Sequence, residues 1–212
     1  TMNLYSIPTF LTSALIIFLG VFSLKRNERS PINRAFFSLC MFPGAWLFFG
    51  SIAYNCPTLP LANFFVRICY VGVVYISIAI FHFTVVFLDL KKLKKIIPYF
   101  YLIGIFWSIC LFSSNLLLDG FKKYFWGYYP QAGVLHPIFI VIFTAVVIFS
   151  NILLMIAFFN GSVSGAKRIQ VKYVLSAIFI FSLASFDFLP NYGIAIYPFG
   201  YIPTAIFVGI IA

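Results

Sequence analysis

The chain has 212 residues, of which 63% are hydrophobic and only 8% are charged, and its formal net charge is +10 at pH 7. So few polar residues cannot cover a soluble globule of this size, and lipid must solvate much of the surface. A strongly basic soluble domain would suggest a nucleic-acid partner, but no stretch combines basic residues with the glycine-rich or aromatic pattern of an RNA-binding surface. The composition therefore excludes an ordinary soluble protein and disfavours nucleic-acid binding.

Seven strongly apolar runs follow one another along the chain. Most hold about 20 residues, the length with which a helix crosses a ~30 Å hydrocarbon core at 1.5 Å per residue. They span residues 4–24, 35–54, 64–88, 96–118, 137–159, 171–189 and 194–212. No gap between them is long enough to house a folded module. The sequence therefore predicts an all-α membrane protein, a seven-transmembrane helix bundle that forms one domain over residues 1–212.

The basic residues sit in every second gap between these runs. Of the 14 Lys and Arg residues, 11 follow the first, third and fifth runs. They are Lys25, Arg26, Arg29, Arg34, Lys91, Lys92, Lys94, Lys95, Lys167, Arg168 and Lys172. Because cytoplasmic loops carry an excess of Lys and Arg, we expect these gaps in the cytoplasm, with the N-terminus outside and the C-terminus cytoplasmic. Anionic lipid headgroups are then their expected partners.

The four cysteines do not form a framework of disulfides. Cys40 and Cys110 fall inside apolar runs, where a thiol is a small apolar filler. Cys56 and Cys69 lie near the outer face and are the one pair that an oxidising compartment would allow to join, although spacing alone cannot establish the geometry of a disulfide. No Cys or His spacing indicates a metal site.

The gap after the fourth run is unusually aromatic, since six of the nine residues from Phe121 to Tyr129 are Phe, Tyr or Trp. Trp and Tyr favour the headgroup layer, so we expect this segment to lie at the membrane surface over the outer end of the bundle. Two interpretations remain open. The segment is either a membrane-surface anchor, which is the commoner role, or a lid over a ligand cavity.

Apart from Lys172 at the edge of the sixth run, three ionisable residues fall within the runs, where a charge is costly and often functional: Arg67, His82 and Asp187. Arg67 and Asp187 lie at similar depth near the outer face, so they are candidates for an ion pair. An equally weighted alternative is that the two side chains do not pair: Arg67 reaches the outer headgroups, and Asp187 makes an interfacial contact beside Pro190. We expect His82 to be hydrogen-bonded between helices, and His136 to be exposed in the outer loop and free to titrate.

No pattern of residues indicates catalysis. Neither histidine has a Ser or Cys nucleophile and an acid at motif spacing. The last run lacks the lysine that a retinal protein needs, and the spans lack the paired acids or the His-Glu-x-x-His motif of an intramembrane protease. Seven spans with little polar content also fit poorly with an inverted-repeat transporter. We therefore expect no cofactor and no enzymatic activity in this fragment.

Several short strings resemble a known family. They are Asn33-Arg34-Ala35-Phe36, the stretch from Arg67 through Tyr70 and Gly72 to His82-Phe83, Asp187-Phe188-Leu189-Pro190 with Gly193, and Tyr197-Pro198-Phe199-Gly200-Tyr201. Together with the number of spans, their orientation and the short loops, they resemble the N-terminal seven-transmembrane sensor region of bacterial histidine kinases. The resemblance covers essentially the whole chain.

This resemblance implies a multi-pass receptor module in the inner (cytoplasmic) membrane of a bacterium, working in a two-component signalling system. A signal at the outer face or within the bundle would shift helices and act on a cytoplasmic output domain, which is expected downstream and is absent here. His82 cannot be the phospho-accepting histidine, because that residue belongs to a soluble helical hairpin. A homodimer is implied as well. The signal itself is open: a small molecule, a lipid or a state of the membrane.

The residues expected to carry the signal lie near the outer mouth of the bundle. Arg67 and Asp187 are the candidates for a polar latch. The residues expected around a possible pocket are Trp126, Tyr128, Tyr129, Asn191 and Tyr192. Two other functions remain open: a small transporter or lipid-handling protein, and a structural membrane subunit that docks a partner through the aromatic segment.

Overall fold

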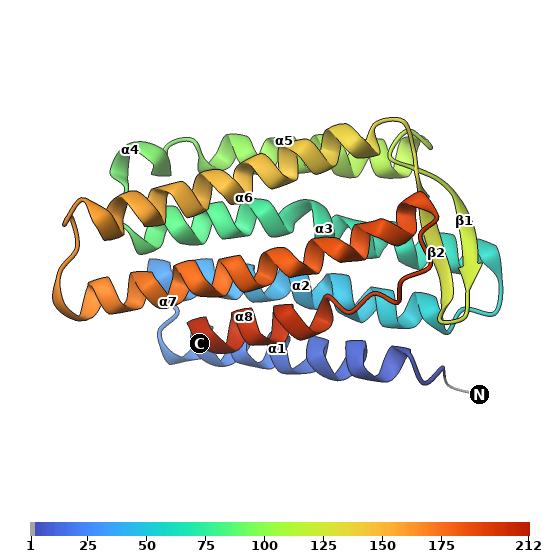
Figure 1. Ribbon diagram of the computed structural model, residues 1–212, viewed down its shortest axis with the longest axis horizontal. Helices are drawn as coiled ribbons and strands as arrows, with labels where there is room; N and C mark the ends of the chain where they lie inside the picture. Colours follow the sequence, from blue (N-terminus) through green and yellow to red (C-terminus); the bar gives the residue numbers. More distant parts are fainter. Residues whose placement is uncertain (1–2) are drawn as a thin grey trace.

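The computed structural model describes residues 3–212 and consists mainly of long helices that run side by side, with a β-hairpin across one end (Figure 1). The α-helices are α1 (Ser6–Arg26), α2 (Pro31–Tyr54), α3 (Leu59–Phe87), α4 (Lys91–Lys94), α5 (Ile97–Ser113), α6 (His136–Phe159), α7 (Gly165–Phe181) and α8 (Tyr201–Ile211). A 3₁₀ helix, η1 (Ser182–Tyr192), continues α7, and the hairpin consists of β1 (Leu118–Tyr124) and β2 (Gly127–Ala132).

Within the described residues, six helical segments are long and apolar enough to cross a membrane, and α8 is a shorter apolar helix. The segments are Ser6–Arg26, Pro31–Tyr54, Leu59–Phe87, Lys91–Ser113, His136–Phe159 and Gly165–Tyr192. This agrees with a seven-helix membrane bundle. The chain is therefore a multi-pass membrane protein, as its composition predicts.

Helix α3 is the centre of the bundle. In its apolar stretch 67% of the residues are buried, against 17% for the Lys91–Ser113 segment. Helix α3 packs against α2, α5 and α6. The peripheral helices instead expose large apolar side chains such as Phe18, Val141 and Phe179. An apolar surface of this kind is stable only against lipid tails, so the outer helices form the lipid-facing layer.

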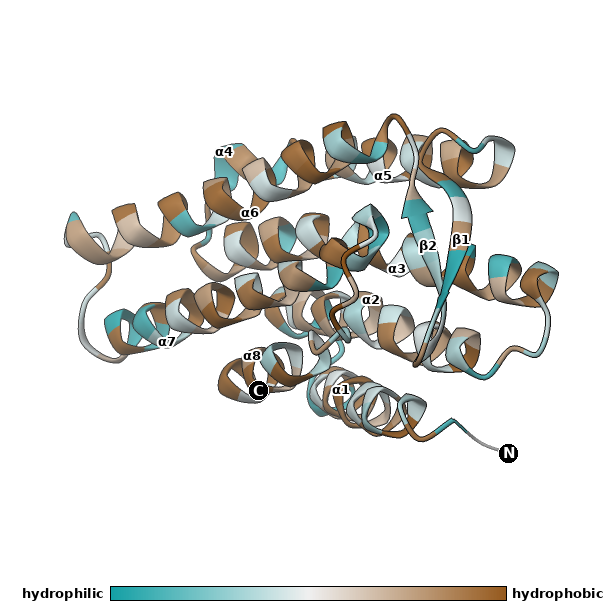
Figure 2. Cartoon of the chain, turned by 45° about the vertical axis from the view of Figure 1, so that its right-hand side comes forward, coloured by the Kyte–Doolittle hydropathy of each residue, from teal (hydrophilic) through white to brown (hydrophobic). Residues whose placement is uncertain are grey.

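The three basic gaps lie together at one end of the bundle, and the hairpin lies at the other (Figure 1). Figure 2 shows hydrophilic residues at α4, at the start of α7 and on the hairpin, with apolar residues along the helices between them. The clustering that the charge pattern requires is thus present in the fold. The side of the membrane that each end faces remains a prediction.

The predicted fourth span extends beyond the helix, and the aromatic segment after it forms a β-hairpin. The predicted run 96–118 is helical only to Ser113, and Leu118 already begins the antiparallel hairpin β1–β2. Ser and Asn weaken the helix here because their side chains bond to nearby backbone: the Ser114 hydroxyl donates to the Cys110 carbonyl at 2.8 Å. At the turn, Tyr124 pairs with Gly127, whose φ of +130° favours glycine.

The predicted boundaries of the last two spans also differ from the structure. Helix α7 begins at Gly165, before the predicted residue 171, and changes to 3₁₀ geometry at Ser182. Residues 194–200 are not helical, so the last helix begins at Tyr201 instead of residue 194. Pro190 lies within η1 and disfavours α geometry there, and the left-handed Gly193 (φ +87°) ends the element.

Candidate functional site

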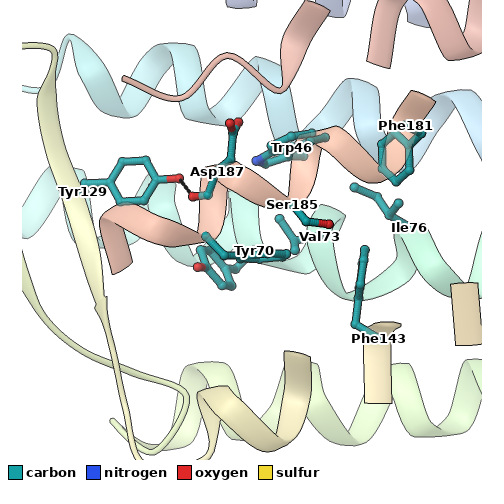
Figure 3. Close-up of a pocket in the computed structure, with 11 residues that line it drawn as sticks. Trp46, Tyr70, Val73, Ile76, Tyr129, Phe143, Phe181, Ser185 and Asp187 are labelled. Carbon is teal, nitrogen blue, oxygen red and sulfur yellow. Dashed lines mark hydrogen bonds between the residues drawn. The ribbon is translucent and has the colours of Figure 1, made fainter. Parts of the chain in front are cut away.

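Two small cavities lie side by side under the hairpin, and four residues line both of them: Trp46, Tyr70, Tyr129 and Asp187. The inner cavity extends between α3, α6 and η1 to Val73, Ile76, Phe143, Phe181, Ala184, Ser185 and Phe188 (Figure 3). The outer cavity extends between α1, α2 and the segment before α8 to Thr9, Leu47, Gly50, Tyr54, Val66, Cys69, Pro130, Pro198 and Tyr201. Their volumes are about 30 and 40 Å³, enough for about two to three water molecules each.

Asp187 stands at the junction of the two cavities and is only 6% exposed. Both carboxyl oxygens accept a hydrogen bond from the backbone N–H of Gly200, at 2.9 and 3.1 Å. Gly200 is the N-cap residue of α8 and has no side chain with which to cap it. The carboxyl group of η1 therefore caps the last helix by accepting from its first free N–H group.

Gly200 makes this contact possible because it has no side chain. A Cβ at this position would lie 2.5 Å from Asp187 Oδ2 and 2.9 Å from the Trp46 ring. Any other residue would push the carboxyl group away from the start of α8. The close approach of η1 to α8 thus depends on this glycine.

The hairpin is fastened to η1 by hydrogen bonds from its side chains. The Tyr129 hydroxyl donates to the Asp187 carbonyl at 2.6 Å, and the Tyr124 hydroxyl donates to the Pro190 carbonyl at 2.8 Å. In return, the Asn191 amide donates to the Pro130 carbonyl at 3.2 Å. Burial raises the pKa of Tyr129 well above 10, so its hydroxyl remains a hydrogen-bond donor at neutral pH. The hairpin and η1 therefore form one connected unit.

A second buried network joins η1 to α3 and α6. The Asn191 amide also donates to the Tyr70 hydroxyl at 2.6 Å, and that hydroxyl lies 3.2 Å from Nε2 of His136. Nδ1 of His136 lies 2.9 Å from the Tyr192 hydroxyl. Because Tyr70 accepts from Asn191, it is free to donate its own proton to Nε2, which assigns the remaining imidazole proton to Nδ1.

The prediction that His136 is exposed is wrong, since its side chain is fully buried. The chain after the hairpin turns inward: the Leu135 amide donates to the Leu116 carbonyl at 2.8 Å, and α6 begins at His136 beneath β1 and β2. Both ring nitrogens then bond within the protein. His82 is hydrogen-bonded between α3 and α5, as predicted, with Nδ1 3.0 Å from the Tyr101 hydroxyl.

The structure does not bring Arg67 and Asp187 together. The Arg67 guanidinium donates to the Leu111 carbonyl, to the Ser114 carbonyl at 3.1 Å and to the Asn115 side chain at 2.9 Å, so it binds the end of α5. In the part of the chain that the structure describes, the salt bridge is that between Lys94 and Asp89 at the opposite end. Arg67 thus satisfies carbonyls that the end of α5 leaves unpaired, while the carboxyl group of Asp187 is bound to Gly200.

The predicted aromatic residues take different places. Tyr129 lines both cavities, whereas Trp126 is fully buried within the hairpin and stacks on Tyr124 with ring centroids 4.4 Å apart. Tyr128 lies beside Lys123, whose Nζ is 5.5 Å from the ring centroid. Asn191 and Tyr192 belong to the His136 network. Of the seven predicted site residues, Tyr129 and Asp187 thus line the cavities.

Sequence reasoning missed Trp46, Gly200 and the role of Tyr70. Tyr70 and Gly200 occur in the strings that carry the family resemblance, which is a signal that could have placed them near Asp187. Trp46 gave no signal, because an aromatic residue within an apolar span is ordinary. Its place beside Asp187 follows only from the packing of α2 against α8.

The four cysteines are free, so Cys56 and Cys69 do not form a disulfide in this structure. The Cys69 thiol lies 3.2 Å from the Trp46 carbonyl, and the Cys56 thiol lies 3.4 Å from the Ile52 carbonyl. Over residues 3–212 no group of three or more His, Cys, Asp or Glu side chains is placed to hold a metal ion.

Comparison with known proteins assigns the fold to a family. A family model described as the N-terminal 7TM region of histidine kinase matches residues 8–212, which is nearly the whole chain. No curated protein and no solved structure gives a match. The matched range runs from the second residue after the start of α1 to the end of α8, so it includes the hairpin, η1 and Asp187. The chain belongs to the family of N-terminal seven-transmembrane sensor regions of histidine kinases.

Proposed function

We propose that this chain is the sensory input module of a signalling protein in the cytoplasmic membrane, and that it transmits a signal from the outer cavities to a cytoplasmic output domain through α8. The observation that carries the proposal is the position of Asp187. Its backbone carbonyl is held by the hairpin through Tyr129, while its side chain holds the start of the last helix at Gly200. One residue therefore links the outer surface to the helix that leads to the C-terminus.

The 3₁₀ helix η1 is the element that we expect to change. It spans 11 residues, whereas 3₁₀ runs longer than three or four residues are uncommon because their hydrogen bonds are poorer. Pro190 disfavours α geometry at itself and at the residue before it, so the conversion is limited to residues 182–188. It would shorten η1 by about 3.5 Å, since the rise per residue falls from about 2.0 to 1.5 Å. A movement of this size is about two-thirds of one helical turn. Two such states would give the module a discrete switch.

A ligand controls this switch if it binds one state better than the other. Ala184, Ser185, Asp187 and Phe188 of η1 all line the inner cavity, so its filling depends on the conformation of η1. The hairpin covers both cavities through Tyr129, which supports the role of a lid for the aromatic segment. In this proposal the chain itself carries out no reaction; it changes shape.

The proposal is tested by measuring the position of α8 after its cap is removed. Labels for distance measurement are introduced as non-canonical amino acids at two exposed positions, Ile206 on α8 and Ile148 on α6. The Asp187→Ala variant is expected to broaden the distribution of distances between them, because α8 loses its attachment to η1. The matched control is Asp119→Ala, which removes an exposed acid at the same end of the bundle.

An unchanged distribution in Asp187→Ala would contradict the coupling. A second readout is the autophosphorylation rate of the parent kinase in membranes. The rate is expected to change in Asp187→Ala and to stay at the wild-type value in Asp119→Ala. Equal rates in all three proteins would contradict the assignment of α8 as the output helix.

A further inference from the structure

We infer that the two cavities bind a small organic cation, namely a primary alkylammonium ion whose charged group meets Asp187 in the outer cavity and whose chain extends into the inner one. This inference rests on the proposed sensory function and names the chemical class of its ligand. It is drawn from the charges and the side chains that surround Asp187.

The first step is that Asp187 has no cationic partner. No Lys, Arg or His lines either cavity, and within residues 3–212 no basic side chain forms a salt bridge with Asp187. The nearest candidate from the sequence, Arg67, is engaged by the end of α5. A carboxylate offers about four acceptor sites, and the N–H of Gly200 is shared between its two oxygens. Acceptor capacity therefore remains.

The second step concerns the walls of the outer cavity, where five of the thirteen lining residues are aromatic. These are Trp46, Tyr54, Tyr70, Tyr129 and Tyr201. The face of an aromatic ring is the negative side of its quadrupole, so it attracts cations and repels anions. Aromatic rings around a carboxylate are the arrangement that recognises ammonium groups. Both parts of the site thus favour a positive ligand.

The third step is the orientation of the carboxyl group. Figure 3 shows Asp187 between Tyr129 and Trp46, with its carboxyl group directed away from Ser185 and the inner cavity. It points towards the segment that precedes α8, where Pro198 and Tyr201 line the outer cavity. The charged end of the ligand is therefore assigned to the outer cavity.

The inner cavity determines the other end of the ligand. Beyond the four shared residues its lining is apolar except for Ser185. This chemistry suits an alkyl chain and excludes a second charged group. The volumes of about 30 and 40 Å³ require η1 or the hairpin to move before a chain can enter, which is the coupling that the sensor needs.

The test is a series of alkylammonium ions from methylammonium to octylammonium, compared with the alcohols of the same length. The thermal unfolding midpoint of the purified protein is measured in a neutral detergent at pH 7 as each compound is titrated. The amines are expected to raise the midpoint, with an apparent affinity that grows about fourfold per methylene until the inner cavity is full. Alcohols that stabilise the protein as well as the amines do would overturn the inference.

Asp187→Asn separates the charge from the helix cap, because an amide oxygen still accepts a hydrogen bond from Gly200. We expect this variant to keep α8 in place but to lose roughly ten- to a hundredfold in amine affinity, as expected when a charge-assisted hydrogen bond is removed. Asp119→Asn is the matched control and should bind like the wild type. Equal affinities in the wild type and Asp187→Asn would also overturn the inference.

These outcomes are distinct from those of the proposed function. If Asp187→Ala loses the attachment of α8 but amines and alcohols stabilise the protein equally, the sensory function is supported and the cation site is rejected. If Asp187→Asn does not fold, the amine and alcohol series on the unchanged protein still decides the question. If amines bind but α8 does not move, the cation site is supported and the sensory function is rejected.

Discussion

At the scale of single residues, the backbone of α2 approaches α3 closely at Gly72. A Cβ at this position would lie 2.7 Å from the backbone nitrogen of Trp46 and 2.8 Å from the carbonyl oxygen of Phe42. Backbone atoms cannot turn aside as a flexible side chain can. Gly209 on α8 is the opposite case, because a Cβ there would meet nothing within 4 Å.

We therefore expect Gly72→Ala to lower the free energy of unfolding by about 1–3 kcal/mol, since the helices must separate to admit the methyl group. Gly209→Ala should leave it unchanged or raise it by up to about 1 kcal/mol, because Ala is the better helix former. Denaturant unfolding in detergent, followed by tryptophan fluorescence, measures both. If the two variants were equally stable, the close approach of α2 and α3 would be disproved.

Arg67 and Asp187 have separate partners, so their substitutions should act independently. Arg67→Ala removes the bonds to the end of α5, and Asp187→Ala removes the cap of α8. We expect each to cost about 1–3 kcal/mol of unfolding free energy, and the double variant to cost the sum within about 0.5 kcal/mol. A thermodynamic cycle on the four proteins measures this. A coupling energy above about 1 kcal/mol would show that the two side chains pair in the membrane.

At the scale of elements, the hairpin and η1 depend on each other. A two-stranded sheet alone is marginally stable in water, and here the hydroxyl groups of Tyr124 and Tyr129 fasten it to η1. The stability of the hairpin and the conformation of η1 are thus coupled through a few hydrogen bonds. Removal of one of these hydrogen bonds should therefore destabilise the whole hairpin.

Tyr129→Phe tests this coupling, since it removes the donor to the Asp187 carbonyl and keeps the ring. We expect amide hydrogen exchange of β1 and β2 to become about fivefold faster, which corresponds to the loss of one hydrogen bond of about 1 kcal/mol. Tyr128→Phe is the control, because in the described structure its hydroxyl makes no hydrogen bond. If both variants exchanged at the wild-type rate, the hairpin would be held by packing alone.

At the scale of the whole molecule, the two ends of the bundle differ in charge. The end with α4 and the start of α7 carries the clustered cations, and the opposite end carries the hairpin (Figure 2). Translocation of so many cations across a membrane is unfavourable, so this asymmetry orients the bundle. The hairpin is therefore expected outside and the 160–164 loop inside.

Single cysteines test this orientation in intact cells with a membrane-impermeant maleimide. Phe125→Cys, at the exposed hairpin turn, should react at once, whereas Ser162→Cys should react only after the cells are permeabilised. Cys110, which is only partly buried, is replaced with alanine in both variants, and the other three cysteines are buried. Labelling of both positions in intact cells would contradict the proposed topology.

The sequence by itself determined the membrane fold, the number of spans and the clustering of charges at one end. These features follow from local hydrophobicity and charge, which need no knowledge of neighbours in space. It also singled out Asp187 and Tyr129 as candidate site residues, because a charge within a span and an aromatic cluster are unusual in themselves.

Only the tertiary structure decided what these residues contact. Asp187 could have met Arg67, but the free carbonyls at the end of α5 and the side-chain-free Gly200 offered each of them a different partner. The burial of His136 and the position of Trp46 likewise depend on how the hairpin and α2 pack, which no local pattern encodes. The partners of a buried polar group are set by competition among all groups within reach, and that competition exists only in the folded chain.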